Sequence, residues 1–230
     1  MLKELWKKIQ RRLLKLRLKP IRVFCFHQVS DTFDESTMKE CDWLQTDAFK
    51  RIINDMQQNG YEFISLPEAH EKIRNDRFRS MKYAVLTADD GWASMKNILP
   101  WLNEQQIPIT LFLNPGYLDG KLFREIETEK YLTEDEVKHL YEQYPLLTIG
   151  MHGWEHVDAT KQTEEEFKES LKQSMRYLRE LPNYVSYFAY TWGRHTRATD
   201  AYLQLQGIVP IYMNGKMNYN NQDVIHRELL

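Results

Sequence analysis

Two adjacent carboxylates and a glycine follow a short apolar run, and this pattern favours a bound cation. Residues 85–88 form the run, and Asp89, Asp90 and Gly91 come directly after it. Like charges side by side raise each other's pKa, so a positive group nearby is the natural partner of the ionised pair. A turn at Asp90-Gly91, with Asp89 capping the next helix, is the alternative explanation of these residues.

Two histidines four residues apart form the second group that could do chemistry. His152 and His156 follow the apolar residues at 147–151. Residues four apart lie on one side of a helical turn, so both imidazoles can reach one ion. With a carboxylate they make a three-ligand site that leaves positions open for water and substrate. The alternative is that the two histidines are unrelated surface or core residues. The histidines and the aspartates both follow predicted strands, however, which favours one joint site.

A third predicted strand end, near residues 187–194, is rich in aromatic side chains. Such rings can simply cap a core, but rings at the mouth of a barrel also stack on sugars. Tyr190 and Trp192 are therefore candidates for substrate binding.

The elements that must position these residues are predicted by an alternation of β-rich runs and helical periods after Pro20. Capping boxes at Thr133 with Glu136 and at Thr163 with Glu166 indicate two helix starts. Strands joined by helical crossovers run parallel, and about seven right-handed crossovers close, or nearly close, a barrel with its active face at the carboxyl ends. The predicted strands are residues 21–29, 61–66, 83–90, 107–114, 146–152, 184–192 and 207–213. We therefore expect an α/β fold, a distorted (β/α) barrel of about seven parallel strands in a single domain over residues 20–230.

The composition is that of an ordinary globular protein. Of the 230 residues, 42% are hydrophobic and 28% are charged, which excludes disordered and collagen-like classes. A single α/β domain of this size needs no structural metal, so a metal here would serve chemistry. The two cysteines, Cys25 and Cys41, are too few for a disulfide framework. Cys25 lies in an apolar run and is expected to be a buried thiol, which favours a reducing compartment.

The amino-terminal segment differs in charge from the rest of the chain. Residues 1–19 hold eight basic residues and one acid, a charge of +7, so a net charge of -2 leaves -9 for the remainder. This balance gives no electrostatic footprint for nucleic acid, and no run of 18 apolar residues exists to span a bilayer. The apolar residues of the segment recur at helical spacing: Leu2, Trp6, Ile9, Leu13 and Leu16.

Residues 1–19 are therefore predicted to form a basic amphipathic helix, for which two roles are open. It could lie on an anionic membrane, or it could pack on the flank of the domain. The segment lacks the uninterrupted apolar stretch of a secretory signal. We expect a cytoplasmic protein with peripheral contact to the inner face of a membrane.

The order of the three groups resembles the NodB-homology polysaccharide deacetylases of carbohydrate esterase family 4. The matching residues are Thr-x-Asp-Asp-Gly at 87–91, His-x-x-x-His at 152–156 and Phe-Ala-Tyr-x-x-Gly at 188–193. The segments 23–29 and 49–66 resemble the family's opening strand and the helix and strand that follow it. The resemblance extends over residues 21–230 and implies a NodB-type barrel that removes N-acetyl groups with one divalent metal, usually zinc.

The resemblance also implies roles for individual residues. Asp90, His152 and His156 would be the metal ligands, and Asp89 would be the general base. The family's catalytic acid is a histidine near the carboxyl end, and His226 is the available candidate. The segment 223–227 fits the family's Leu-x-His pattern only loosely. It is equally similar to a terminal segment in which the arginine alone recurs. His27, at the end of the first strand, is expected to be a polar member of the substrate site.

Several positions depart from the family's pattern without removing a ligand. Ala88 stands where phenylalanine is usual, Gly153 follows the first histidine, and Thr191-Trp192 replaces a Pro-Tyr pair. The arginine that many relatives place in the third motif to orient the base is Ala189 here, a form that a subgroup of the family shares.

The leading functional hypothesis is a metal-dependent hydrolase that removes N-acetyl groups from an amino sugar of a cell-envelope glycan or its precursor. Its partner would be an N-acetylated saccharide, with no nucleic acid. Hydrolysis of another N-acyl or N-formyl sugar or small amide is an alternative, and a non-catalytic carbohydrate-binding relative is another. Serine hydrolase chemistry lacks its Gly-x-Ser-x-Gly elbow.

Overall fold

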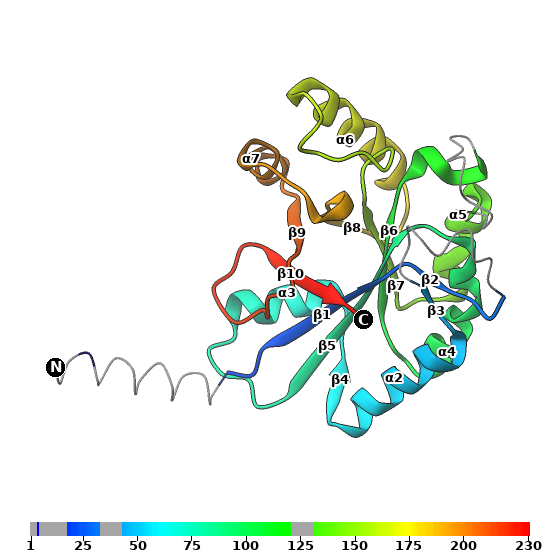
Figure 1. Cartoon of the computed structure of the whole chain (residues 1–230), viewed down its shortest axis with the longest axis vertical. Helices are drawn as coiled ribbons and strands as arrows, with labels where there is room; N and C mark the ends of the chain where they lie inside the picture. Colours follow the sequence, from blue (N-terminus) through cyan, green and yellow to red (C-terminus); the bar gives the residue numbers. More distant parts are fainter. Residues whose placement is uncertain (1–3, 5–17, 33–42, 121–130) are drawn as a thin grey trace.

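Seven parallel strands close into a barrel in the computed structural model, which describes residues 4, 18–32, 43–120 and 131–230 (Figure 1). The expected (β/α) barrel is therefore confirmed. Around the ring the strands are β1 (Ile21–Phe26), β10 (Ile225–Leu229), β9 (Val209–Met213), β8 (Tyr184–Ala189), β7 (Leu147–Met151), β6 (Ile109–Leu113) and β5 (Lys82–Asp90), and β5 pairs again with β1.

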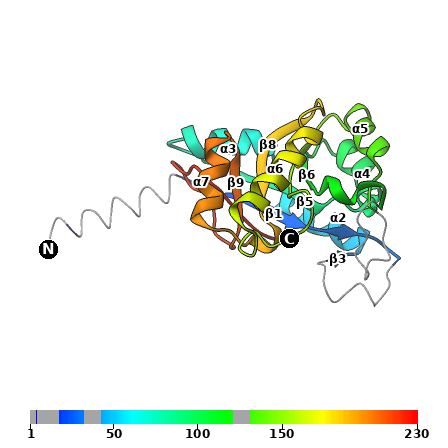
Figure 2. The same ribbon diagram turned by 90° about the horizontal axis from the view of Figure 1, so that it is seen from above.

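Helices connect the strands and surround the barrel (Figure 2). Both predicted capping boxes are present, at Thr133 with Glu136 and at Thr163 with Glu166. The helices are α2 (Thr46–Gln58), α3 (Leu66–Asn75), α4 (Leu99–Glu104), α5 (Glu134–Gln143), α6 (Glu164–Leu178) and α7 (Arg197–Leu205), with 3-10 turns η1 (Ala93–Asn97), η2 (Pro115–Gly120) and η3 (Thr191–Gly193). The two-residue strands β2 (Gln28–Val29) and β3 (Trp43–Leu44) pair with each other outside the ring.

One predicted strand lies outside the barrel, and one barrel strand was missed. Residues 61–66 contribute only β4 (Tyr61–Phe63), which pairs with the start of β5 without joining the ring. The missing ring member is β10, which lies between β1 and β9. Its central residues are charged or polar, so it lacks the apolar run by which buried parallel strands are recognised.

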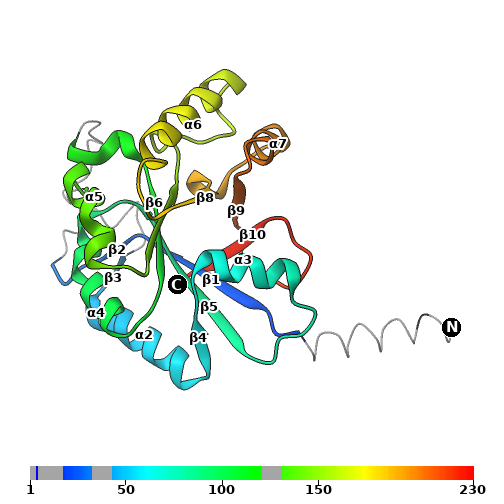
Figure 3. The ribbon, with the colours of Figure 1, turned by 180° about the vertical axis from the view of Figure 1, so that it is seen from behind.

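The interior of the barrel has its own apolar core, closed at one end by α3. In Figure 3 this helix crosses in front of the strands. Its apolar face packs on the interior, and His70 Nδ1 lies 3.1 Å from the hydroxyl of Tyr187 on β8. The interior strand residues are Ile21, Val23, Val85, Phe112, Tyr187, Ala189, Ile211 and Ile225, and α3 adds Leu66, Ala69 and Ile73.

A buried arginine shows that α3 covers the amino-terminal end of the strands. Arg79, just before β5, donates hydrogen bonds to the carbonyls of Lys19, Lys72 and Tyr219. Lys19 lies two residues before β1, and Lys72 lies in the last turn of α3. The opposite end, where the carboxyl ends of the strands meet, is therefore left for chemistry.

The predicted amino-terminal helix falls almost entirely outside the described residues. Of its last two residues, Leu18 forms a parallel bridge with Arg79, and Lys19 N–H donates to the Arg79 carbonyl at 3.0 Å. These two residues are therefore extended. Within the described part of the chain, no helix combines the length and apolarity needed to cross a bilayer.

Gly150 on β7 is required by a close approach inside the barrel. A Cβ at this position would lie 2.4 Å from the ring of Phe112 on β6 and 3.2 Å from the carbonyl of Tyr187. Phe112 thus occupies the interior volume that a side chain on residue 150 would need.

We expect Gly150→Ala to lower the free energy of unfolding. Overpacking costs about 1–3 kcal/mol, which exceeds the gain of about 0.5–1 kcal/mol from replacing a strand glycine. Urea denaturation would measure the change. Phe112→Leu removes the ring atoms that clash, so the alanine should cost less in that background. An equal cost in both backgrounds would contradict this explanation.

Candidate active site

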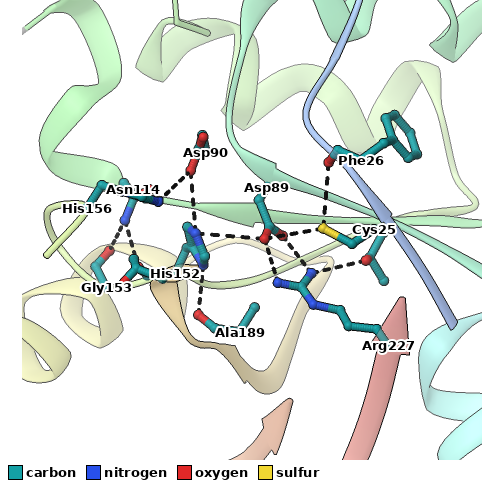
Figure 4. Close-up of polar contacts among 12 residues, drawn as sticks. Cys25, Phe26, Asp89, Asp90, Asn114, His152, Gly153, His156, Ala189 and Arg227 are labelled. Atoms are coloured by element: carbon teal, nitrogen blue, oxygen red, sulfur yellow. Dashed lines mark hydrogen bonds and ion pairs between the residues drawn. The ribbon is translucent and has the colours of Figure 1, made fainter. Parts of the chain in front are cut away.

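The alternation of side chains along the strands brings one set of polar residues to the open end of the barrel (Figure 4). On β1, the interior residues Ile21 and Val23 are followed at the same two-residue period by Cys25 and His27. On β5 the same period leads from Val85 through Thr87 to Asp89. The same two-residue period, continued beyond β6 and β7, places Asn114 and His152 on this interior face. Arg227 on β10 lies on the same face.

The three predicted metal ligands meet at this end. His152 Nε2 lies 3.4 Å and His156 Nε2 lies 3.5 Å from the same oxygen, Asp90 Oδ1. One ligand atom from each residue lies within 4.8 Å of the others. Zinc bonds of 2.0–2.1 Å in a tetrahedron place ligand atoms about 3.4 Å apart. The donor set therefore has the size and chemistry that a tetrahedral zinc ion requires.

Asp90 is held in an unusual backbone conformation that aims its carboxylate. Its φ is 73°, and Gly91 follows with φ 85°. The indole of Trp92 donates a hydrogen bond of 3.1 Å to Oδ2, so Oδ1 is the oxygen turned toward the histidines. Left-handed backbone at a non-glycine residue costs about 1–3 kcal/mol and is found preferentially at functional sites.

His152 is oriented by a backbone carbonyl. Its Nδ1 lies 2.7 Å from the carbonyl oxygen of Ala189, which can only accept, so Nδ1 carries the proton and donates it. Nε2 is buried and has no hydrogen-bond partner among the described residues. Metal-ligating histidines have this arrangement, because the bond at one ring nitrogen orients the other toward the ion.

The charges of this cluster shift its pKa values. Burial alone would raise the pKa of Asp90, but the adjacent imidazole of His152 and the charge of His156 lower it well below its usual range. Burial would likewise lower the pKa of His152, but Asp89 and Asp90 outweigh burial and raise it. A cation at this position would satisfy the same carboxylates and displace the proton from the imidazole.

Asp89 forms a buried bidentate ion pair with Arg227. The guanidinium donates to Oδ1 at 2.7 Å and to Oδ2 at 2.5 Å, and one of its nitrogens also lies 3.1 Å from Thr87 Oγ1. Burial alone would raise the pKa of Asp89, but Arg227 and then His152 lower it. Asp89 is therefore a carboxylate, with its plane fixed by the two parallel hydrogen bonds.

His226 does not reach the site. It neighbours Arg227 on β10, so the alternation that directs Arg227 inward directs His226 outward. There its Nδ1 bonds with Asn214 Nδ2 at 3.0 Å, and burial together with Lys216 lowers its pKa. The structure therefore does not support His226 as the acid.

His27 is the described histidine that lies beside Asp89 without belonging to the metal-ligand set. One of its ring nitrogens lies within 4.8 Å of both Cys25 Sγ and an Asp89 oxygen. The expectation that His27 is a polar member of the site thus agrees with its position.

The two predicted aromatic contacts differ in position. Tyr190 is 1% exposed, and its hydroxyl bonds with Thr199 and Asp200 on α7. It therefore packs between the barrel and this helix and cannot stack on a substrate. Trp192 is 58% exposed and lies edge-on to His156, with ring centroids 4.3 Å apart.

Two contacts fix the turn that carries Trp192. Arg194 donates to Asp158 at 2.8 Å, and the hydroxyl of Thr191 donates to the carbonyl of Val157. Hydrogen bonds from Thr160, and then Arg194, lower the pKa of Asp158 to about 2. The turn after β8 is thereby tied to the loop that carries His156.

Sequence reasoning missed three residues of this site. Arg227 was considered only as the arginine of a terminal segment. The signal that could have identified it is an arginine inside the residue pattern of a buried strand. Asn114, whose amide donates to the carbonyls of His152 and Gly153, gave no signal. Cys25 was expected to be buried, as it is, but its thiol also lies 3.5 Å from Asp89 Oδ2.

Comparison with solved structures shows the same fold. IcaB from Ammonifex degensii superposes with a TM-score of 0.78 at 22% identity, covering 92% of each chain. Streptococcus pyogenes deacetylase PplD in complex with acetate gives a TM-score of 0.78 at 20% identity, covering 93% of each chain. A de-N-acetylase from Aggregatibacter actinomycetemcomitans gives 0.73 at 18% identity, covering 92% of this chain and 95% of that one.

A search of curated proteins finds no match to this chain. The model of the polysaccharide deacetylase family matches residues 77–211, which is more than half of the chain and contains the two aspartates and both candidate ligand histidines. The chain therefore belongs to the polysaccharide deacetylase family.

Proposed function

We propose that this protein is a metal-dependent deacetylase that hydrolyses the N-acetyl group of an amino sugar in a cell-envelope glycan or its precursor. The observation that carries the proposal is the three-ligand cluster of Asp90, His152 and His156 beside the ionised carboxylate of Asp89. Family membership supports a hydrolase acting on N-acetyl groups of polysaccharides.

The donor set of one carboxylate and two imidazoles favours zinc. When bound there, the ion would polarise the amide carbonyl and lower the pKa of water at its open position toward 7. His152 and His156 hold their Nε2 atoms at the position this requires, and Ala189 fixes the tautomer of His152.

Asp89 is proposed to accept the proton from the attacking water. Its Oδ2 lies 3.8 Å from His152 Nε2, which places the carboxylate beside the ligand cluster. Arg227 keeps Asp89 ionised and prevents the carboxylate from rotating. The ion pair lowers the basicity of Asp89, but it ensures that an acceptor is present before each turnover.

His27 is proposed to donate the proton that the departing sugar amine requires. It lies beside Asp89 on the interior face of the chain that continues β1, whereas His226 points away from the barrel. A proton donor must reach the reacting atoms, so position favours His27 over His226.

The exposed ring of Trp192 is proposed to contact the sugar. It lies next to the ligand His156 and is fixed by its surrounding turn, so a sugar stacked on it would have its acetamido group near the ion. Acetate, the product expected of this reaction, is the ligand named for the PplD structure.

We also propose a cytoplasmic location with peripheral contact to the inner face of a membrane. Residues 1–19 carry a charge of +7 with apolar residues at helical spacing. The exposed side chains of Phe78 and Met81 flank Arg79, which binds Leu18 and Lys19. Apolar surface therefore adjoins the point where the basic segment meets the barrel.

We expect Asp89→Asn to lower the free energy of unfolding, because Arg227 loses its buried partner. The folded variant should retain zinc and release acetate about 10²–10⁴-fold more slowly, because asparagine cannot accept the proton. His152→Ala, the matched variant, should lose zinc and activity together. The measurements are metal content by mass spectrometry and acetate release from N-acetylated oligosaccharides. Turnover by Asp89→Asn at the rate of the unmodified enzyme would contradict the assignment of the base.

His27→Ala should lower turnover by about 10²-fold or more if this imidazole is the acid. His226→Ala is the matched control and should retain turnover, because its ring bonds with Asn214 outside the barrel. The comparison is made by kcat on the same oligosaccharides. Loss of turnover in the His226 variant alone would reverse the assignment.

The full chain should sediment with anionic liposomes, and a variant beginning at Pro20 should not. Basic residues near an anionic surface contribute about 1 kcal/mol each. Binding should weaken as salt rises, because the Debye length is about 8 Å at physiological ionic strength and shorter above it. Neutral liposomes are the control. Equal recovery of both proteins in the supernatant with anionic liposomes would reject the membrane location.

A further inference from the structure

A second group of metal-ligating side chains lies directly beside the proposed catalytic centre. The atoms offered by Cys25, His27 and Asp89 all lie within 4.8 Å of one another. Cys25 Sγ lies 3.5 Å from Asp89 Oδ2. Zinc bonds of about 2.3 Å to sulfur and 2.1 Å to oxygen place these two atoms about 3.6 Å apart in a tetrahedron. The pair is thus already spaced as two ligands of one ion.

We propose that Cys25, His27 and Asp89 form a second site for a thiophilic divalent cation, Zn²⁺ or Cd²⁺, and that its occupation inhibits the enzyme. The three residues come from the two neighbouring strands β1 and β5 and the residue that follows β1. The interior alternation places Cys25 and His27 on one face of the chain.

The ligand types determine which ions this site takes. A thiolate with an imidazole and a carboxylate selects Zn²⁺ or Cd²⁺ over Mg²⁺ or Ca²⁺, which prefer oxygen. Burial raises the pKa of the Cys25 thiol, so the group is an S–H that donates to Asp89 until an ion arrives. Binding breaks the S–H bond, forms a sulfur–metal bond and releases the proton to water; no oxidant or reductant takes part.

Inhibition follows because Asp89, the proposed base, would be a ligand of the ion in the second site. An ion there binds an oxygen of Asp89 and competes with Arg227, which donates to both oxygens of that carboxylate. It also takes His27, the proposed acid. This inhibitory part rests on the proposed function, whereas the binding part does not, so the two are tested by separate measurements.

Binding is tested by adding Cd²⁺ to the zinc-loaded full chain and recording the ultraviolet sulfur-to-cadmium charge-transfer band. The proposed catalytic site contains no sulfur, so cadmium exchange there gives no such band. The chain has two cysteines, which provides a matched pair of variants. Cys41→Ser should retain a band that saturates at one equivalent, and Cys25→Ser should lose it.

Two further variants keep the test decisive if the serine variant folds poorly. Cys25→Ala, which brings no hydroxyl into the buried position, should also lose the band. His27→Ala retains the sulfur, and its cadmium affinity should fall by about tenfold or more, since losing even an outer partner of a ligand costs 10–100-fold. No band in the unmodified protein, or a band that survives both Cys25 substitutions, would overturn the site.

Inhibition is tested with excess Zn²⁺ on the zinc-loaded enzyme. Removing a general base costs about 10²-fold or more, so saturating zinc should lower acetate release by that factor. The effect should be retained in Cys41→Ser and weakened in Cys25→Ser relative to each variant's own rate at stoichiometric zinc. A Cys25-dependent band with equal zinc inhibition in both variants would overturn the inhibitory role and leave the binding site standing. A chain without acetate release at stoichiometric zinc would refute the proposed function, and the cadmium band would still decide the site.

Discussion

The ion pair between Asp89 and Arg227 is the interaction on which both the barrel and its site depend. Both side chains are almost completely buried, at 3% and 1% exposure. Removing each charge from water costs several kcal/mol, which only a bidentate partner offsets, and loss of one partner from a buried pair costs about 3–5 kcal/mol. The pair joins β5 to β10, the two strands that flank β1, so the last strand of the chain is held in the ring by the same contact that orients the carboxylate. Outside the ring, Arg22 on β1 pairs with Glu228 on β10 at 2.8 Å, but this partly exposed pair contributes less.

The open end of the barrel departs from regular strand geometry where the candidate ligands lie. Asp90 has positive φ directly at the end of β5, and Trp192 has φ 51° in the turn after β8. Each conformation costs about 1–3 kcal/mol. The indole of Trp92 and the contacts of Thr191 and Arg194 hold these two residues in place. Stability is thus supplied by the apolar interior and the helix layer, and the rim carries part of the backbone strain.

The sequence predicted most of the barrel because apolar runs and capping boxes are local signals. It predicted the cluster of Asp90, His152 and His156 through spacing together with a family resemblance. It missed β10, because a strand with a buried arginine and two outward polar side chains has no apolar period. Whether His226 or Arg227 points into the site depends on which side chains of β10 face the interior. The register of β10 within the ring determines this, and the local sequence does not. Tyr190 and Trp192 likewise differ in exposure because of backbone conformation that composition does not encode.

Under the proposed membrane location, the joining of Leu18 and Lys19 to Arg79 would have a consequence for the size of the substrate. These residues lie at the end of the barrel closed by α3, whereas the ligand cluster lies at the opposite end. β5 runs between the two ends with nine residues, a height of about 24 Å at 3.3 Å per residue and a tilt of about 36°. A barrel anchored to a bilayer through residues 1–17 would hold the ligand cluster that far above the headgroups. A single sugar next to its lipid would then be out of reach, and a glycan long enough to bend back over the rim would be selected by length alone.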